Sequence, residues 1–330
     1  MGWTRTGRKG AFCYLDARGR PIRDEAKLAR IERLVIPPAW SDVWISPSPT
    51  AKLQATGHDA VGRKQYLYHP DFRAAQERAK YDKLVRFAER LPELRAHMSE
   101  HFDKDELDRE RVSAIALRVI DLGWLRVGSE RYARQSHTYG ITTLLKRHVA
   151  VRGSQIRLDF RGKDGIEVRT TLVDEELAAA VRGLLVFRGG PRIFRYRWED
   201  GLYNLTSRRL NDYVKIYLGS EFSAKDFRTW GGTLSAAIAL AEASEGDPKR
   251  VVAAAMRKTA AKLGNTPAVS RASYVSPAVI EQYLEGRTIA DFRPRHLRVV
   301  DARQTGLDAE EAALLSLLRS WRIRQAREAA

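Results

Sequence analysis

Four side chains beyond residue 120 of this 330-residue chain have the chemistry needed to break and rejoin a phosphodiester bond. The phenol of Tyr274 is a nucleophile that can attack phosphorus and hold the bond energy as a tyrosyl phosphate ester. The guanidinium groups of Arg126 and Arg228 can stabilise the negative charge that develops on the non-bridging oxygens. Lys163 can donate a proton to the departing oxygen. Such a transesterification needs neither a metal ion nor a nucleotide.

The first two cations stand at predicted ends of secondary structure. Gly123 ends a predicted helix and Ser129 can cap the next one, so Arg126 lies at a junction where its side chain can be aimed. Lys163 falls at the turn between two alternating segments, which predict a two-stranded β-hairpin over residues 154–173. A hairpin tip is narrow enough to enter a groove of a nucleic acid. Taken singly, such residues are most often solvated surface groups.

Arg228 precedes a predicted helix. That helix is expected to begin after Gly231 and Gly232, which leaves Arg228 on or just before the first turn, where a phosphate is favoured. Lys225 supplies a second cation three residues earlier. An ordinary salt bridge at a helix start would explain this local pattern about as well.

Tyr274 lies in a turn-rich stretch between two predicted helices. Gly264 is expected to end the first helix, and Ser276 to cap the second, with a proline as its first residue. Tyr274 stands just before that cap, where a tyrosine is usually half-buried packing. Asn265, next to Gly264, would ordinarily be a helix-stop residue.

The net charge of the chain points to a polyanionic partner. Its 58 Lys and Arg against 41 Asp and Glu give a formal charge of +17. Nucleic acid is the first candidate, an acidic membrane surface the second, and a merely basic protein without such a partner the alternative. No run approaches the roughly 18 apolar residues of a membrane span. A single cysteine, Cys13, and the absence of a signal-peptide pattern predict a cytoplasmic protein.

Motifs for cofactors are missing from the sequence. None of the seven histidines stands in an H-x-E arrangement, so a metal site is not expected. There is no phosphate-binding loop of the G-x-x-x-x-G-K-[ST] type and no strand followed by G-x-G-x-x-G. We therefore expect no metal, no nucleotide and no other cofactor.

The texture of the sequence changes near residue 70. Residues 1–80 hold 15 basic and 8 acidic side chains, and their short β-prone pieces are separated by Pro, Gly and Asp. The following segment carries apolar residues at helical spacing, interrupted at Pro92. We predict an α+β protein with a small β-rich domain over residues 1–76 and a mainly α-helical domain over 77–330. Helices are predicted near residues 175–185, 206–218, 231–243, 248–262, 277–285 and 308–327.

Taken in order, these motifs resemble those of the type IB DNA topoisomerases, specifically the small bacterial branch similar to poxvirus topoisomerase. The matching pieces are L-R-V-G-S-E around Arg126, Lys163 at its turn, Lys225-x-x-Arg228-T-W-G-G-T, and L-G-N-T-P-A-V-x-R-x-S-Y, which ends at Tyr274. IPPAWSDVWISP and LQATGHDAVGRKQYLYH are similar to the N-terminal domain of that branch. The resemblance covers nearly the whole chain.

The resemblance implies a fold and an activity. The fold would be that shared by type IB topoisomerases and tyrosine recombinases, with the catalytic lysine on a β-hairpin. Tyr274 would form a 3'-phosphotyrosyl bond, Arg126 and Arg228 would bind the non-bridging oxygens, and Lys163 would protonate the 5'-oxygen with help from Lys225. The nicked duplex would swivel, relax its supercoils and be religated without ATP or metal. Asn265 stands where histidine is commoner in the family, and it would contact the phosphoryl group as a neutral donor.

The resemblance also assigns a role to the first domain. It would close over double-stranded DNA as half of a clamp formed by a monomer, in a cytoplasmic protein associated with the nucleoid. The expected DNA contacts lie in one strand and its preceding turn: Arg63, Lys64, Gln65, Tyr66 and Tyr68. The alternative for the two tyrosines is plain strand alternation that places one of them in the core.

Two other functions remain open at this point. A tyrosine recombinase shares the catalytic fold, but usually carries His-x-x-Arg where this chain has Lys225-x-x-Arg228, and its N-terminal domain is helical. A basic architectural DNA-binding protein would explain the charge and leave the ordered motifs as coincidence. Resolution of Holliday junctions would favour the first, and binding without nicking the second.

Overall fold

The computed structural model describes residues 2–244, 246–293 and 306–328. The chain divides into two compact units, Met1–Asp82 and Lys83–Ala330. The division falls inside helix α2 (Pro70–Phe102), as does the boundary near residue 76 predicted from the sequence. Helix α2 continues through Pro92, where the sequence predicted an interruption.

The N-terminal unit is built on an antiparallel sheet of five strands in the order β2-β1-β3-β4-β5. The predicted β-rich character of this region is confirmed. The strands are β1 (Trp3–Arg8), β2 (Ala11–Leu15), β3 (Ser41–Ile45), β4 (Leu53–His58) and β5 (Lys64–Tyr68). β2 and β5 form the two edges of this sheet.

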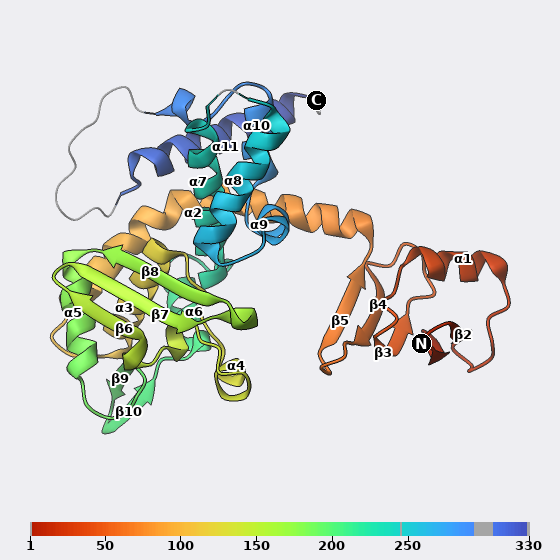
Figure 1. Ribbon diagram of the computed structural model, residues 1–330, viewed down its shortest axis with the longest axis horizontal. Helices are drawn as coiled ribbons and strands as arrows, with labels where there is room; N and C mark the ends of the chain where they lie inside the picture. Colours follow the sequence, from red (N-terminus) through yellow and green to blue (C-terminus); the bar gives the residue numbers. More distant parts are fainter. Residues whose placement is uncertain (1, 245, 294–305, 329–330) are drawn as a thin grey trace. The chain divides into compact units, whose positions relative to one another are not determined.

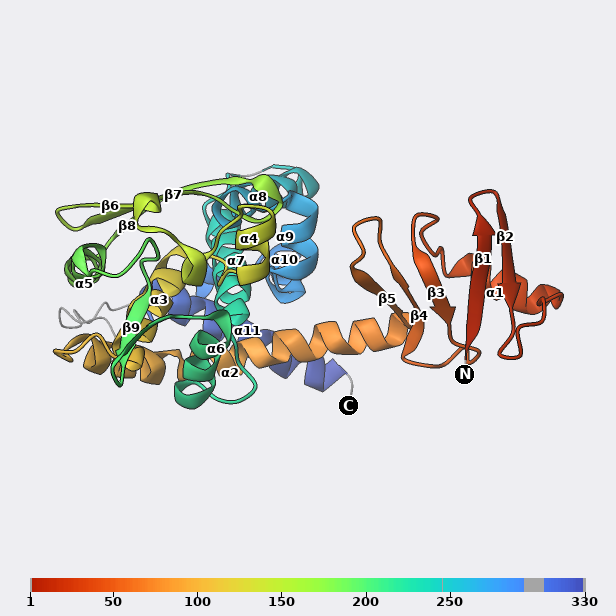
Figure 2. The same cartoon turned by 90° about the horizontal axis from the view of Figure 1, so that it is seen from below.

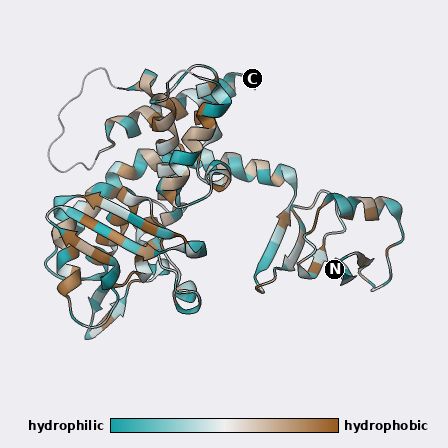
Figure 3. Ribbon diagram, in the orientation of Figure 1, coloured by the Kyte–Doolittle hydropathy of each residue, from teal (hydrophilic) through white to brown (hydrophobic). Residues whose placement is uncertain are grey.

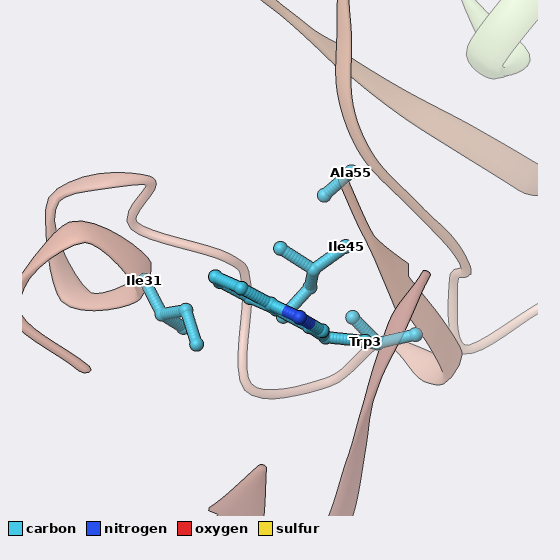
Figure 4. Packing of buried hydrophobic residues seen from close by; sticks show 5 residues of the cluster. Trp3, Ile31, Ile45 and Ala55 are labelled. Carbon is cyan, nitrogen blue, oxygen red and sulfur yellow. The ribbon is translucent and has the colours of Figure 1, made fainter. Parts of the chain in front are cut away.

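A small core lies between this sheet and helix α1 (Glu25–Arg33), a helix that was not predicted from the sequence. The indole of Trp3 on β1 extends toward Ile31 of α1, with Ile45 of β3 beside it (Figure 4). Asp24 caps α1 by accepting a hydrogen bond from the backbone N–H of Lys27. The Asp24 cap and the apolar position at Ile31 were the sequence signals for this helix.

The second unit is mainly helical, as predicted (Figure 1). Its helices are the rest of α2, α3 (Arg109–Gly123), α4 (Glu130–Gln135), α5 (Glu175–Val186), α6 (Ser207–Tyr217), α7 (Ala224–Ala241), α8 (Pro248–Leu263), α9 (Pro267–Ser273), α10 (Pro277–Leu284) and α11 (Ala309–Glu328). Its strands are β6 (Val149–Arg152), β7 (Gln155–Arg161), β8 (Glu167–Val173), β9 (Arg195–Trp198) and β10 (Gly201–Asn204).

The predicted hairpin belongs to a larger sheet. β7 and β8 pair as expected, but β6 pairs with β7 on its other side and makes a three-stranded sheet, so the expectation of an isolated two-stranded element was wrong. Apolar and polar residues alternate along β7 and β8 (Figure 3), and the apolar face is covered by α3 and α5 (Figure 2). The hairpin is therefore anchored at its base, with its tip left outside the core.

The helices near the C-terminus pack around α7. This helix contacts α3, α6, α8, α10 and α11, and most of its residues are buried.

Within the part of the chain that the structure describes, none of the helices has the length and apolar character of a membrane span.

Candidate active site

Helix α7 begins earlier than the sequence indicated, and this changes the setting of Arg228. Its N-cap is Ser223, whose backbone N–H and hydroxyl donate to Asp226 Oδ2 at 2.8 and 2.9 Å. Arg228 therefore lies inside the helix, with only 3% of its surface exposed, and the prediction of a helix start after Gly231 and Gly232 was wrong.

The two glycines are explained by their neighbours. A Cβ atom on Gly231 would lie 2.2 Å from the indole of Trp124, and one on Gly232 would lie 2.8 Å from the carbonyl oxygen of Tyr274. Glycine disfavours a helix interior by roughly 1 kcal/mol relative to alanine. Here it permits the close approach of the chain segments that carry the site.

Both arginines are held by backbone carbonyls at the C-terminal end of α8. Arg228 donates through Nη2 to Leu263 O at 2.9 Å and through Nη1 to Trp124 O. Arg126 donates through Nη2 to Gly264 O at 3.2 Å and to Asn265 Oδ1. The last carbonyls of a helix have no partner within the helix, so they are free to accept these bonds. Gly264 ends α8 in the left-handed conformation, as predicted.

Tyr274 follows directly on α9, a helix that the sequence analysis took for a turn-rich stretch. Thr266 caps α9 and Pro267 begins it, a start signal that was overlooked. The backbone carbonyl of Tyr274 accepts a hydrogen bond from Thr233 Oγ1 of α7 at 3.2 Å. The ring centroid of Tyr274 lies 5.0 Å from the guanidinium carbon of Arg228. The tyrosine is thus fixed at both its backbone and its ring.

The charges around Tyr274 favour its ionised form. Burial alone would raise the pKa of the phenol, but the positive charges of Arg228, Arg126 and Lys225 together lower it. The pKa of Arg228 is itself lowered to about 10, first by burial and then by repulsion from Arg126. The site therefore concentrates positive charge where an anion can compensate it.

Lys163 lies at the tip of the β7–β8 hairpin, in a single turn, η3 (Lys163–Gly165). Asp164 takes a left-handed φ of 61° there and Gly165 one of 79°. The side chain of Lys163 is 58% exposed, and its Nζ is 3.9 Å from Asp164 Oδ2. Such an exposed ion pair restrains the ammonium only weakly, so it can move toward a ligand.

One cavity brings the predicted residues together. A hollow of about 390 Å³ is lined by all five of Arg126, Lys163, Lys225, Arg228 and Tyr274. A second hollow of about 510 Å³ is also lined by Arg126, Lys163 and Arg228, together with Gly264. Asn265 is joined to this group through Arg126. One nucleophile and four cations, from four separate segments of the chain, therefore line one concave surface.

Two buried donors at this site are unused. Arg228 Nε and Asn265 Nδ2 are inaccessible to solvent and have no hydrogen-bond partner among the residues that the structure describes. Leaving a buried donor unpaired costs roughly 1–3 kcal/mol. An acceptor supplied by a ligand would remove this cost.

Trp124 supports the site, although the sequence did not point to it. Its carbonyl accepts from Arg228 and its indole covers Gly231. It ends α3 in the left-handed conformation, with φ 50°, so Gly123 is the last helical residue and not the cap. A contact through a backbone carbonyl does not depend on the side chain, so the sequence does not reveal it. The tryptophan directly after the glycine that ends α3 was the signal that could have drawn notice.

In the N-terminal unit, the predicted DNA contacts divide into two groups. Tyr66 and Tyr68 lie on the same face of edge strand β5, exposed at 49% and 41%, with ring centroids 6.2 Å apart. Because residues i and i+2 share a face, neither is in the core, and the alternative that one would be was wrong. Lys64 Nζ lies 5.8 Å from the ring centroid of Tyr66.

The other two side chains point to an acidic neighbour. Arg63 Nε and Gln65 Nε2 both donate to Asp59 Oδ2, at 2.7 and 2.9 Å. They hold the turn before β5 in shape. The exposed face of β5 is therefore formed by Lys64, Tyr66 and Tyr68.

A tyrosine beside two arginines and two lysines is suited to phosphoryl transfer through a tyrosyl ester. Comparison with known proteins identifies a family for the chain. Residues 69–291 match the family model of the eukaryotic DNA topoisomerase I catalytic core, and residues 11–59 match that of the bacterial DNA topoisomerase IB N-terminal domain.

Individual relatives carry the same names. DNA topoisomerase 1B of Acanthamoeba polyphaga mimivirus is 34% identical over 291 residues, which cover 84% of this chain and 86% of the viral one. DNA topoisomerase 1B of Vaccinia virus (strain Copenhagen) is 23% identical over 70% of this chain and 72% of its own. DNA topoisomerase 1 of Schizosaccharomyces pombe is 25% identical over 65% of this chain and 25% of its own. The chain belongs to the type IB DNA topoisomerases, in their bacterial branch.

Proposed function

We propose that this protein relaxes supercoiled duplex DNA by cutting one strand with Tyr274, letting the duplex swivel and closing the nick. The observation that carries the proposal is the cavity lined by Tyr274 together with Arg126, Lys163, Lys225 and Arg228. It combines a nucleophile with four cations on one concave surface, as attack on a phosphodiester requires.

In the cleavage step, the phenolate oxygen of Tyr274 attacks phosphorus. The new P–O bond to tyrosine forms as the P–O5' bond breaks, which leaves a 3'-phosphotyrosyl ester and a free 5'-hydroxyl. The positive charges around the phenol lower its pKa and so help it to lose its proton. Lys163 gives a proton to the departing 5'-oxygen, with Lys225 as a second cation for proton relay. Religation is the reverse reaction, so the cycle requires neither ATP nor a metal ion.

The arginines stabilise the transition state. The unused Arg228 Nε and Asn265 Nδ2 are the donors best supported as contacts to the non-bridging oxygens, because each is buried and lacks a partner within the described chain. Arg126 is already oriented by Gly264 O and by Asn265, and adds a second guanidinium. Fixed donors of this kind require little reorganisation as charge develops. Asn265 contributes a neutral N–H, so we expect it to matter less than either arginine.

The N-terminal unit is proposed to bind the same duplex. The exposed Lys64, Tyr66 and Tyr68 on β5 offer one charge and two flat rings, and Arg63 and Gln65 shape the adjoining turn. In this proposal a monomer closes its two domains, 1–76 and 77–330, around DNA as a clamp. The enzyme would work in the cytoplasm, associated with the nucleoid.

The test is relaxation of supercoiled plasmid in the presence of EDTA and without ATP. The wild type is expected to relax the plasmid, and Tyr274→Phe to bind DNA but not relax it. Tyr283, on α10, is the matched control, and Tyr283→Phe should retain activity. An inactive wild type, or an active Tyr274→Phe variant, would overturn the proposal. A Holliday junction included as a second substrate tests for recombinase-like resolution.

A further inference from the structure

A buried ionic cluster joins α2, α3 and α11. Arg95 of α2 is paired with Asp121 of α3 at 2.9 Å and with Glu311 of α11 at 2.7 Å, and all three side chains are at most 11% exposed. Burial by itself would lower the pKa of Arg95. The charge of Asp121, together with the hydrogen bonds to both carboxylates, outweighs burial and raises that pKa above its usual value. Arg118 adds a further cation 3.6 Å from Asp121.

Glu311 is fully engaged within this cluster. Its Oε1 accepts from Arg95 Nη2 at 2.9 Å and from the indole N–H of Trp230 at 3.0 Å. Its Oε2 accepts from Arg95 Nη1 at 2.7 Å and from the backbone N–H of Asp308 at 3.1 Å. Removal of one partner from such a buried network is costly because it leaves the others unpaired.

Trp230 connects this cluster to the proposed site. It is 1% exposed, and it stands two residues after Arg228 on α7. Phe87 packs against it from α2 at a centroid distance of 6.3 Å. Because a helix is stiff over one turn, the rotation of α7 that seats Trp230 against Glu311 also fixes the direction in which Arg228 leaves the helix.

Helix α11 also holds α10, which begins three residues after Tyr274. Gln282 of α10, fully buried, donates through Nε2 to the carbonyl of Leu317 at 2.8 Å, and Trp321 Nε1 donates to Glu281 Oε2 at 2.8 Å. One helix is thus bonded both to the element that carries Arg228 and to the element that follows Tyr274. Figure 1 shows α11 beside α7 and α10.

We propose that Glu311 is a positioning residue for strand cleavage: through Trp230 it sets the placement of Arg228 against Tyr274. The proposal rests on the function proposed above. It assigns the C-terminal helix to the reaction, in addition to the stability of the fold. Neither Glu311 nor Trp230 lines the cavity around Tyr274, so any effect on cleavage must be indirect, and the Glu311–Trp230 bond is the direct link from α11 to the helix that carries Arg228.

The experiment compares rate and binding in Glu311→Ala, Trp230→Phe and the double variant. Single-turnover cleavage of a short duplex at saturating DNA gives the rate of the cleavage step. DNA affinity is measured separately, with each change placed in a Tyr274→Phe background that cannot cleave. Each single variant is expected to slow cleavage about 10- to 100-fold while DNA affinity changes less than twofold. Because both remove the same hydrogen bond, the double variant should be scarcely slower than the slower single variant.

A matched control separates positioning from stability. Leu318 is buried on α11 seven residues after Glu311, and therefore on the same face. Leu318→Ala removes packing there but leaves the Glu311–Trp230 bond, so it should lower the melting temperature without changing the cleavage rate at a temperature where every variant is folded.

The outcomes distinguish the two proposals. Cleavage by the wild type with unchanged rates in Glu311→Ala and Trp230→Phe would overturn the positioning role alone. Multiplicative effects of the two changes, or equal slowing by Leu318→Ala, would do the same. Failure of the wild type to cleave at all would instead overturn the proposed function.

Discussion

The cations of the two units are used in opposite ways. In the N-terminal unit, Lys64 stands on an exposed face of an edge strand, beside two exposed tyrosine rings. In the helical unit, Arg228 is 3% exposed and is bonded to two backbone carbonyls. The first kind of charge is screened by salt and placed loosely, whereas the second is held in one geometry at a cost in desolvation. Binding and chemistry thus place different demands on the same residue types.

The largest expected effect is at the buried end of this comparison. Arg228→Ala should reduce the single-turnover cleavage rate by about 10³-fold, because a fixed donor to the transition state is lost. Loss of its charge also raises the pKa of Tyr274, so the pH dependence of cleavage should shift to higher pH. The measurement is the cleavage rate from pH 5 to 10, with circular dichroism to show that the variant is folded.

Asn265→Ala serves as the control for Arg228, since it removes a neutral donor from the same surface. A loss of about tenfold is expected there, with little shift in the pH profile. If Asn265→Ala lost as much cleavage rate as Arg228→Ala, or more, the ranking of charged above neutral donors at this site would be wrong.

An effect smaller than that of Arg228→Ala, but larger than that of Asn265→Ala, is expected at the hairpin tip, where Lys163 is more exposed than Arg228. Lys163→Ala should slow cleavage about 10²-fold on ordinary DNA. A substrate with sulfur at the 5'-bridging position should restore the rate, because a thiolate leaves without protonation. Arg169→Ala, on the neighbouring strand β8, is the control and should not respond to sulfur. Equal slowing of Lys163→Ala on both substrates would remove it from the role of acid.

The smallest effect is expected at the exposed end. Lys64→Ala should weaken DNA binding a fewfold and reduce the slope of log affinity against log salt by about one, since one phosphate contact is lost. The cleavage rate at saturating DNA should not change. Lys27→Ala, on α1 of the same unit, is the matched control. A fall in the saturated rate of Lys64→Ala would show that the contrast between the units is wrong.

The sequence alone predicted several of the elements that have local signals. The β-rich start, the helical remainder, the turn at Lys163 and the end of α8 at Gly264 were all predicted, because alternation, helical spacing and a left-handed glycine act within a few residues. The roles of the proposed site residues stay predictions. They came from the order of motifs and not from any one of them.

Helices α1 and α9 had local start signals, at Asp24 and at Thr266–Pro267, that were overlooked. The other errors have a common physical origin in contacts distant along the chain. Gly231 and Gly232 were taken as helix breakers because their reason for being there, the approach of Trp124 and Tyr274, appears only after folding. The third strand β6 depends on its pairing with β7, and the carbonyls that orient Arg126 and Arg228 carry no side-chain signal. Tertiary neighbours outweighed local propensity at each of these places.

The shared attachment of both arginines to the end of α8 has a consequence for how the enzyme can change over evolutionary time. Leu263 O and Gly264 O are adjacent groups on one backbone, so a shift of this helix end moves both guanidinium groups together. Substitutions along α8 are then poorly able to retune one arginine alone. Variation in cleavage rate among descendants of this chain should accumulate on the hairpin and on α7, where Lys163 and Lys225 can move independently.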